Sequence, residues 1–239
     1  LLITEIASGD VDTLSSVERI EFIEGTFDLV VGTNGDDGLG PPDTDAIFVV
    51  AGDGTNNVGG SDNEDIYYGG DSTDFVGTGD GNDTIYGEPD IDQDAYLDGG
   101  AGDDDITLLA DIGGVGTVVA GDGNDIVRFG VGSSIQISLG AGQDTLLPGV
   151  WPEQYGYGEG GSWATVTDFT AGAGGDIIDL SEFISYLELD PDAVHFGTYF
   201  ALEQHADGVA VLLGQNGNVA TDSIIVMVLD GVNLADLTA

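Results

Sequence analysis

Basic residues and cysteine are nearly absent from this sequence. Its 239 residues contain no lysine, two arginines and no cysteine, whereas aspartate and glutamate number 45 and the formal net charge is −43. Without a basic surface the chain cannot neutralise phosphates, which excludes a nucleic-acid-binding protein and disfavours attachment to anionic lipid. The absence of cysteine excludes a disulfide framework and thiolate chemistry.

Long apolar runs and the features of a cleaved export signal are also missing. The longest apolar run, 224–229, has the length of a strand and falls short of the roughly 20 residues of a membrane-spanning helix. The first ten residues, LLITEIASGD, lack the basic segment and apolar core of a cleaved signal. Because the chain does not begin with Met, we expect a fragment or a processed product.

Glycine, aspartate and apolar residues dominate what is present. An apolar content of 41% separates the chain from acidic disordered tails, which contain few such residues. The 45 acidic groups among 239 residues would repel one another in a compact fold. Since the chain provides almost no positive charge, a divalent metal ion is the first candidate for the missing counter-charge.

A nine-residue frame recurs over the first two thirds of the chain. It has Gly at positions two and four, Asp at position six and a large aliphatic residue at position eight. The clearest copies are 78–86 (TGDGNDTIY), 99–107 (GGAGDDDIT), 120–128 (AGDGNDIVR) and 139–147 (LGAGQDTLL). Weaker copies are 32–40, 51–59, 59–67 and 69–77.

Each position of the frame has a physical reason. The glycines permit positive φ and a tight turn whose carbonyls face an ion, and the aspartate adds a carboxylate for Ca²⁺, which takes about six to eight oxygen ligands. A turn of about six residues and a strand of about three form half a coil, so two units complete one coil of a parallel β-roll. The residues at position eight are expected inside the roll: Leu39, Val58, Ile66, Val76, Ile85, Ile106, Val127 and Leu146.

The spacing of the copies predicts two edges of turns. Position two falls at Gly52, Gly70 and Glu88 on the first edge, and at Gly60, Gly79, Gly100, Gly121 and Gly140 on the second. Position six of the second edge then stacks as Glu64, Asp83, Asp104, Asp125 and Asp144. Because neighbouring coils lie about 4.8 Å apart, one ion can bridge two turns. We expect a continuous row of ions on the second edge and a patchy one on the first, where position six holds Asp37, Asn56, Asp74 and Asp92.

The frame resembles the calcium-binding nonapeptide of the RTX (repeats-in-toxin) family, G-G-x-G-x-D-x-U-x with U a large aliphatic residue. The stretch 12–29 looks like the strand–turn–strand segment that precedes such repeats. The stretch 166–180 (VTDFTAGAGGDIIDL) with Ser181 resembles the flank that follows them. The end of the chain, 228–239, resembles the uncleaved C-terminal signal of proteins exported by type I secretion, a route that needs no N-terminal signal.

The resemblance implies an all-β chain with three regions. These are N-terminal flanking strands over 1–31, a right-handed parallel β-roll (a β-solenoid) over 32–148, and an aromatic and Gly-rich connection with a C-terminal β cap over 149–239.

The frame and the resemblance together nominate calcium ligands. The repeat contributes Gly35, Asp37, Asp74, Gly79, Gly81, Asp83, Gly100, Gly102, Asp104, Gly121, Gly123, Asp125, Gly140, Gly142 and Asp144. In the following flank, Asp168, Asp176 and Asp179 are candidates for one more site, with turn capping as the alternative. Weaker candidates are Gly52, Gly54, Asn56, Glu64 and Asp92, of which Asn56 and Glu64 depart from the Asp of the motif.

For the remaining candidate groups a structural role is expected, with a functional role as the alternative. The aromatic residues Trp151, Tyr155, Tyr157 and Trp163 are expected to plug the end of the roll, with sugar stacking as the alternative. The two histidines, His195 and His205, are expected in structural or surface roles and not in a zinc site. Arg128 is expected to bridge acidic neighbours. Since the 239 residues contain no catalytic constellation, we expect no enzyme within this chain.

These observations predict a secreted, extracellular module that folds on binding several Ca²⁺ ions after passage through the type I secretion machinery. Two alternatives stay open. One is a calcium-dependent adhesin or self-assembling surface-layer or filament component, with a homo-oligomeric, cell-surface or polysaccharide partner. The other is the non-catalytic C-terminal part of a secreted protease, lipase or polysaccharide-modifying enzyme.

Overall fold

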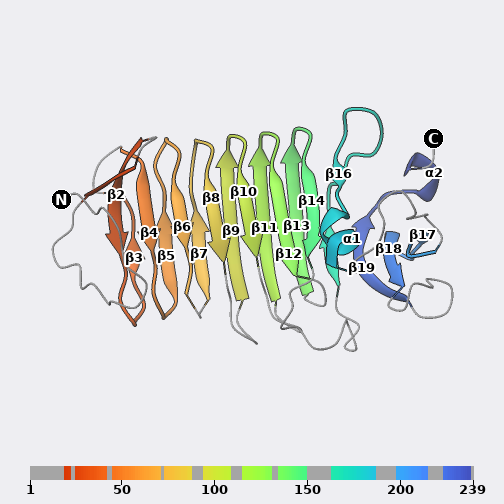
Figure 1. Ribbon diagram of the computed structural model, residues 1–239, viewed down its shortest axis with the longest axis horizontal. Coiled ribbons are helices and arrows are strands. Elements are labelled where there is room, and N and C mark those ends of the chain that lie inside the picture. Colours follow the sequence, from red (N-terminus) through yellow and green to blue (C-terminus); the bar gives the residue numbers. More distant parts are fainter. Residues whose placement is uncertain are drawn as a thin grey trace.

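The fold is known from a computed structural model that describes residues 19–22, 25–41, 45–70, 73–87, 94–108, 115–130, 134–149, 163–186, 198–214 and 223–237. Among these described residues, strands account for 57% and helices for 5%. The parallel strands stack into a β-solenoid of about five turns (Figure 1). This confirms the predicted fold class.

The chain alternates between two sheets. The even sheet contains β2 (Gly25–Val31), β4 (Ile47–Val50), β6 (Ile66–Tyr68), β8 (Thr84–Gly87), β10 (Asp105–Leu108), β12 (Ile126–Gly130), β14 (Thr145–Gly149) and β16 (Ile177–Ile178). The odd sheet contains β3 (Gly38–Leu39), β5 (Asn56–Gly59), β7 (Asp74–Gly77), β9 (Asp94–Ala101), β11 (Val115–Asp122), β13 (Ser134–Ala141) and β15 (Ala164–Val166). Within each of these sets the neighbouring strands run parallel, so the described passages between the sheets are turns at the edges of the solenoid.

The N-terminal flank adds one antiparallel strand to the even sheet. Strand β1 (Arg19–Phe22) pairs with β2, with Arg19 opposite Asp28, and β2 in turn runs parallel to β4. Both strands of the predicted strand–turn–strand segment are therefore present, whereas 12–18 and the intervening 23–24 lie outside the described residues.

The interior is filled by the aliphatic residues of the frame. Side chains alternate across each strand, so position eight faces inward while its neighbours face outward. Of the predicted interior residues, Val58, Val76, Ile85, Ile106, Val127 and Leu146 are buried, and Leu39 is half-buried against the core. The prediction for Ile66 is wrong: Ile66 is half-buried and faces outward, and Tyr67, only 1% exposed, takes the interior position.

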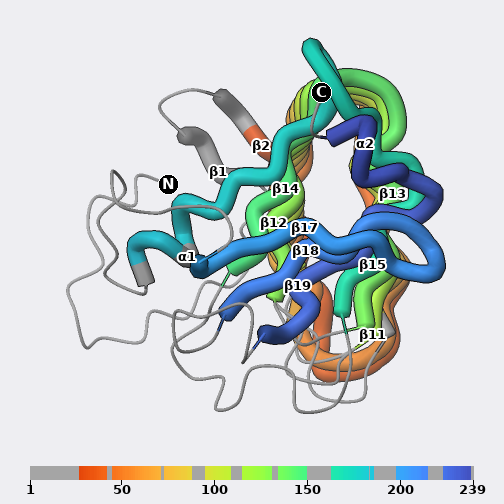
Figure 2. The backbone as a smooth tube through the Cα atoms, turned by 90° about the vertical axis from the view of Figure 1, so that its right-hand side faces the viewer, coloured from red at the N-terminus to blue at the C-terminus, as the bar shows by residue number. Residues whose placement is uncertain are grey.

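A β-hairpin and one more strand cover the C-terminal end of the solenoid. Strands β17 (Phe200–Gln204), β18 (Gly208–Gly214) and β19 (Ser223–Asp230) pair antiparallel, and β19 continues the odd sheet beside β15. Figure 2, which looks along the solenoid, shows the three strands in front of the stacked coils. The hairpin contributes Phe200, Val211 and Leu213 to the common core, which supplies the cap that a solenoid end requires.

The predicted aromatic plug is not what covers this end in the described residues. Trp151, Tyr155 and Tyr157 lie outside them. Trp163 packs on the outer side of the odd sheet, against a small cluster of Ala210, Leu212 and Val228. The two helices, α1 (Ser181–Tyr186) and α2 (Leu234–Leu237), are short, and among the described residues no helix has the length and apolar character of a membrane span.

Candidate metal centre

Six aspartates stand above one another where the turns of the second edge enter the even sheet; we call them the aspartate column. Its members are Asp65, Asp83, Asp104, Asp125, Asp144 and Asp176. The backbone N–H of each member donates to Oδ1 of the next, at 2.7, 2.8, 2.8, 2.9 and 3.1 Å in that order. One carboxylate oxygen per aspartate thus extends the hydrogen bonding of the even sheet beyond the ends of its strands.

The other oxygen, Oδ2, is unpaired in the middle of the column. In Asp83, Asp104, Asp125 and Asp144 this atom is buried and meets no hydrogen-bond donor among the described residues. The Thr78 hydroxyl near Asp83 donates to the carbonyl oxygen of Gly99, at 2.8 Å. Because an unpaired buried carboxylate oxygen is costly, four in successive coils form a place where a cation, if bound, would lower the free energy of the fold.

The two ends of the column differ from its middle. Oδ2 of Asp65 accepts the backbone N–H of Ser61 at 2.6 Å, and Oδ2 of Asp176 accepts that of Thr170 at 2.7 Å. The protein itself therefore satisfies the terminal members, and the demand for a cation is confined to the four central ones.

The pKa values of the central aspartates are raised, which means that the metal-free site disfavours their ionised form. Burial raises the pKa of Asp104 to about 7, and those of Asp83 and Asp144 to about 6. It also raises the pKa of Asp125. Neighbouring carboxylates add to the rise, while the backbone N–H donors oppose it. A bound cation reverses these effects, because it favours the ionised carboxylate.

The turns bring backbone carbonyls to the same edge. Gly79 and Gly81 have φ of 105° and 129°, which an L-residue with a side chain rarely adopts. A Cβ atom on Gly100 or Gly102 would overlap the carbonyl oxygen of Gly79 or Gly81 in the coil below. The same stacking recurs from Gly100 and Gly102 to Gly121 and Gly123, and from these to Gly140 and Gly142. Glycine is required at frame positions two and four of the four clear copies, because each of their turns approaches the turn before it this closely.

The donor set fits a hard cation such as Ca²⁺. It consists of aspartate oxygens and turn carbonyls, with no sulfur or imidazole at this edge. Among the described residues no three acidic or histidine side chains gather into one cluster. An ion between two turns would therefore take most of its ligands from the backbone, together with the unpaired Oδ2 atoms.

A second ladder, which sequence reasoning missed, runs along the outside of these turns at frame position five. The backbone N–H of Asp103 donates to the side-chain oxygen of Asn82 (2.9 Å), that of Asn124 to Asp103 (2.7 Å) and that of Gln143 to Asn124 (3.1 Å). This ladder runs in the opposite direction to the aspartate column. The signal was present in the sequence, since position five of the four clear copies is always Asn, Asp or Gln.

On the first edge, the protein itself provides hydrogen-bond partners for the position-six residues that the structure describes. Asp74 accepts the backbone N–H of Asn56 at 3.0 Å and the hydroxyl of the buried Tyr67. Asp37 accepts both the backbone N–H and the hydroxyl of Thr33, at 2.6 and 2.9 Å. Both carboxylates are thus paired within the protein.

Asn56 is the most informative residue of the first edge. Its Oδ1 accepts the N–H of Asp37 at 3.1 Å, and its Nδ2 donates to the carbonyls of Gly54 and Gly52 at 3.1 and 3.4 Å. Gly52 and Gly54 occupy frame positions two and four, whose carbonyls were predicted to face an ion. The amide nitrogen of Asn56 acts on them as a donor in place of a cation.

The structure corrects one unit of the predicted frame. Gly79 and Gly81 stack on Ser61 and Asn63, so these residues hold positions two and four, and the unit spans 60–68 instead of 59–67. Glu64 is exposed and lies outside the column, and Asp65 occupies the predicted place of Glu64. The two adjacent glycines at 59–60 displaced the predicted frame by one residue. Asp92, the other weak candidate, lies outside the described residues.

The flank after the repeats contains a further copy of the frame, which the sequence analysis did not separate. Residues 171–179 read AGAGGDIID, with positive φ at Gly172 and Gly174 and with Asp176 at position six. Its turn does not stack on the coil before it: the N–H of Gly175 bonds to the Gly172 carbonyl at 3.1 Å, and a Cβ on Gly172 or Gly174 would meet nothing.

The three candidate ligands of this flank serve three separate places. Asp176 ends the aspartate column. Asp168 caps the end of β13, where it accepts the Ser138 hydroxyl (2.8 Å) and the N–H groups of Leu139 (2.8 Å) and Gly140 (3.0 Å). Asp179 accepts the N–H of Ser181 at 2.8 Å, at the start of α1.

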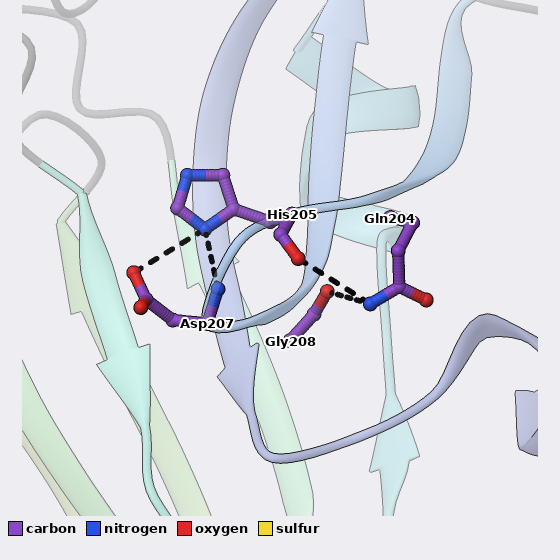
Figure 3. A network of polar contacts seen from close by, with 4 residues as sticks. All are labelled: Gln204, His205, Asp207 and Gly208. Carbon is purple, nitrogen blue, oxygen red and sulfur yellow. Dashed lines mark hydrogen bonds and ion pairs between the residues drawn. The ribbon is translucent and has the colours of Figure 1, made fainter.

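The few basic groups have local roles. Arg128 pairs with Asp105 on the neighbouring strand β10, as predicted for a bridge to an acidic residue. In Figure 3, Nδ1 of His205 receives the N–H of Asp207 at 3.4 Å and lies 3.6 Å from its carboxylate, within the turn between β17 and β18. His195 lies outside the described residues.

A scan of the sequence against models of protein families and a search of curated proteins both find no match.

Proposed function

We propose that this chain is an extracellular calcium-binding module of the RTX kind, and that its solenoid folds when several Ca²⁺ ions bind after type I secretion. One observation carries the proposal: Asp83, Asp104, Asp125 and Asp144 stack in successive coils, each with a buried and unpaired Oδ2. The resemblance of the nonapeptide frame to RTX repeats supplies the family.

The coupling of folding to calcium follows from the charge of the chain. At net charge −43 the carboxylates oppose compaction, and the unpaired oxygens add a desolvation cost to the metal-free fold. Ions bound at the column offset both, so their binding free energy becomes folding free energy. The scarce free calcium inside a cell leaves the chain unfolded and fit for a secretion channel, and affinities of about 10⁻⁴–10⁻³ M suit the extracellular medium.

Circular dichroism during a calcium titration tests the proposal. The chain, freed of metal by chelation, is expected to lose most of its β signal and to regain it cooperatively with Ca²⁺, whereas Mg²⁺ at equal concentration restores little. Calorimetry then counts the ions. A β spectrum that is the same with chelator and with calcium would refute the proposal.

A second candidate function, a self-assembling surface component, is favoured by one exposed row on the even sheet. Val31, Val50 and Tyr68 are in cross-strand register and are 60%, 38% and 42% exposed. Contiguous apolar surface of this kind marks interaction sites. Sedimentation with and without calcium decides: assembly on calcium addition supports this candidate, and a persistent monomer supports the folding module alone.

A further inference from the structure

We propose that the outer face of the odd sheet binds a neutral oligosaccharide, in a hollow of about 430 Å³ across β11, β13 and β15. Trp163 forms one wall, and Thr117, Ser134, Gln136 and Thr165 supply the polar groups. This site lies apart from the aspartate column, and the proposal does not rest on calcium binding.

The polar side chains of the hollow form a regular array. Thr117, Gln136 and Thr165 lie opposite one another on three adjacent strands and face outward, because the residues on either side of each are buried. None of them, nor Ser134, makes a side-chain hydrogen bond to any described residue. The hollow therefore presents free hydroxyl and amide groups, which can both donate and accept.

Trp163 is held in place from behind. It packs against the cluster of Ala210, Leu212 and Val228, and its ring meets that of His205 edge-on, with centroids 5.9 Å apart and planes at 73°. The residue remains half-buried, so part of it is accessible to a ligand. A supported aromatic ring beside a few polar groups is typical of small-molecule sites.

Charge selects the class of ligand. None of the described residues that line the hollow is ionisable, although the chain carries 45 acidic residues. The field of a protein at net charge −43 repels anions, and a cation finds better ligands at the carboxylates elsewhere. With anions and cations disfavoured, a neutral sugar is the ligand that suits the hollow. Its C–H face can pack on the indole ring of Trp163, and its hydroxyls can form hydrogen bonds with the amide and hydroxyl groups of the hollow.

The row of outward residues extends beyond the hollow. From Thr117 it continues in register to Tyr96 on β9 and Phe75 on β7, which are 37% and 49% exposed. These rings lie along the solenoid axis on the same face. The geometry therefore favours an extended oligosaccharide over a single sugar, with its remaining units over Tyr96 and Phe75.

Fluorescence and calorimetric titrations test the site on protein whose β spectrum is intact. The chain has two tryptophans, so Trp151→Phe leaves Trp163 as the single indole reporter. Cellohexaose, maltohexaose and laminarihexaose serve as neutral probes, and trigalacturonate serves as the anionic one. We expect at least one neutral probe to bind and change the Trp163 emission, and the anionic probe not to bind.

Variants locate the binding. Gln136→Ala and Thr165→Ala each remove one hydrogen-bonding group and are expected to weaken binding about threefold to tenfold. Thr145→Ala, an outward threonine of the even sheet, is the matched control and leaves affinity unchanged. Tyr96→Ala weakens binding of the hexasaccharide but not of the corresponding disaccharide. Failure of all three neutral probes, or equal affinity in the Gln136, Thr165 and Thr145 variants, overturns the proposal.

Discussion

The two edges of this solenoid carry the same turn and satisfy it in opposite ways. On the second edge, Asp104 and its neighbours each keep one buried oxygen without a donor. On the first edge, Tyr67 and Thr33 satisfy the carboxylates of Asp74 and Asp37, and the amide of Asn56 satisfies the turn carbonyls. We propose that a cation binds only where the protein provides no donor, so that the donors around position six decide how far each turn depends on metal.

The difference also separates the two halves of the solenoid along its axis. Over 25–77 the described position-six residues, Asp37, Asn56, Asp65 and Asp74, are all paired within the protein. The unpaired oxygens all fall within 78–149. Under the proposed function, the N-terminal coils depend less on calcium than the coils that follow.

Removal of calcium should produce the largest effect, and it should be unequal along the chain. Hydrogen exchange measured by mass spectrometry is expected to show loss of protection throughout 78–149, with smaller loss over 25–77. The reason is that four unpaired carboxylate oxygens lie in the first of these ranges and none among the described residues of the second. Equal loss in both ranges would contradict the comparison of the two halves.

The substitution Asp104→Asn gives the second edge an amide donor like that of Asn56 on the first edge. The amide keeps an oxygen for the N–H of Asp83 and replaces the unpaired oxygen with a donor. In calcium the free energy of unfolding should fall by about 1–3 kcal/mol, because a ligand is lost, while without calcium it should rise by a similar amount. Urea denaturation in calcium measures the first change, and the fraction of β signal that remains in chelator, compared with that of the parent, measures the second. Asp62→Asn, at an exposed turn position, is the matched control. A shift of the same sign in both conditions would be incompatible with a metal role for Asp104.

Asn56→Asp is the reverse exchange. It removes the amide donor from the carbonyls of Gly52 and Gly54 and places a carboxylate beside them. We expect a loss of about 1–2 kcal/mol in the absence of calcium and a gain of one bound ion in its presence. Calorimetry measures the number of Ca²⁺ ions that the variant and the parent bind. An unchanged count together with an unchanged stability would show that Asn56 does not substitute for a cation.

The pH dependence should have opposite signs with and without calcium. In the metal-free fold the pKa of Asp104 is raised to about 7 and those of Asp83 and Asp144 to about 6, so the folded chain binds protons more tightly than the unfolded one. Stability from these groups is present at low pH and is lost as pH rises through about 6–7.

For protein stripped of metal on a resin, the free energy of unfolding should therefore rise by a few kcal/mol at most as the pH falls from about 8 to about 5. The rise is followed as a gain of β signal. Calcium-saturated protein should lose stability over the same interval, because protons compete with the ion for the carboxylates. Asp104→Asn should reduce the metal-free slope. If acidification weakened both forms, burial of these aspartates would not control the metal-free fold.

The parts of the fold that the sequence predicted are those that depend on local spacing. The glycines at 79 and 81, the aspartate at 83 and the aliphatic residue at 85 belong to one turn and its strand, so a nine-residue window contains the whole signal. The aspartate column from Asp83 to Asp144 followed directly from that window repeated at coil spacing.

The parts that were missed depend on partners in other coils. The choice of Asp65 over Glu64 required the turn of Gly79 and Gly81 that stacks on it, and the pairing of Asp74 required Tyr67. A window of nine residues contains none of this information.

The sequence by itself determined the charge that opposes folding, the coil period, the glycines that close the turns and the interior side chains of the repeats other than Tyr67. The sequence can determine these features because turn geometry and side-chain alternation depend on only a few neighbouring residues. The tertiary structure alone decided which carboxylates are satisfied. The Oδ1 atoms of the column receive their donors from neighbouring coils, 18 residues or more away. The Oδ2 atoms of Asp65 and Asp176 receive an N–H group from only four and six residues away, and the shape that the preceding turn takes in the fold brings that group into place. Stacking therefore left four oxygens unpaired on one edge and none among the described residues on the other.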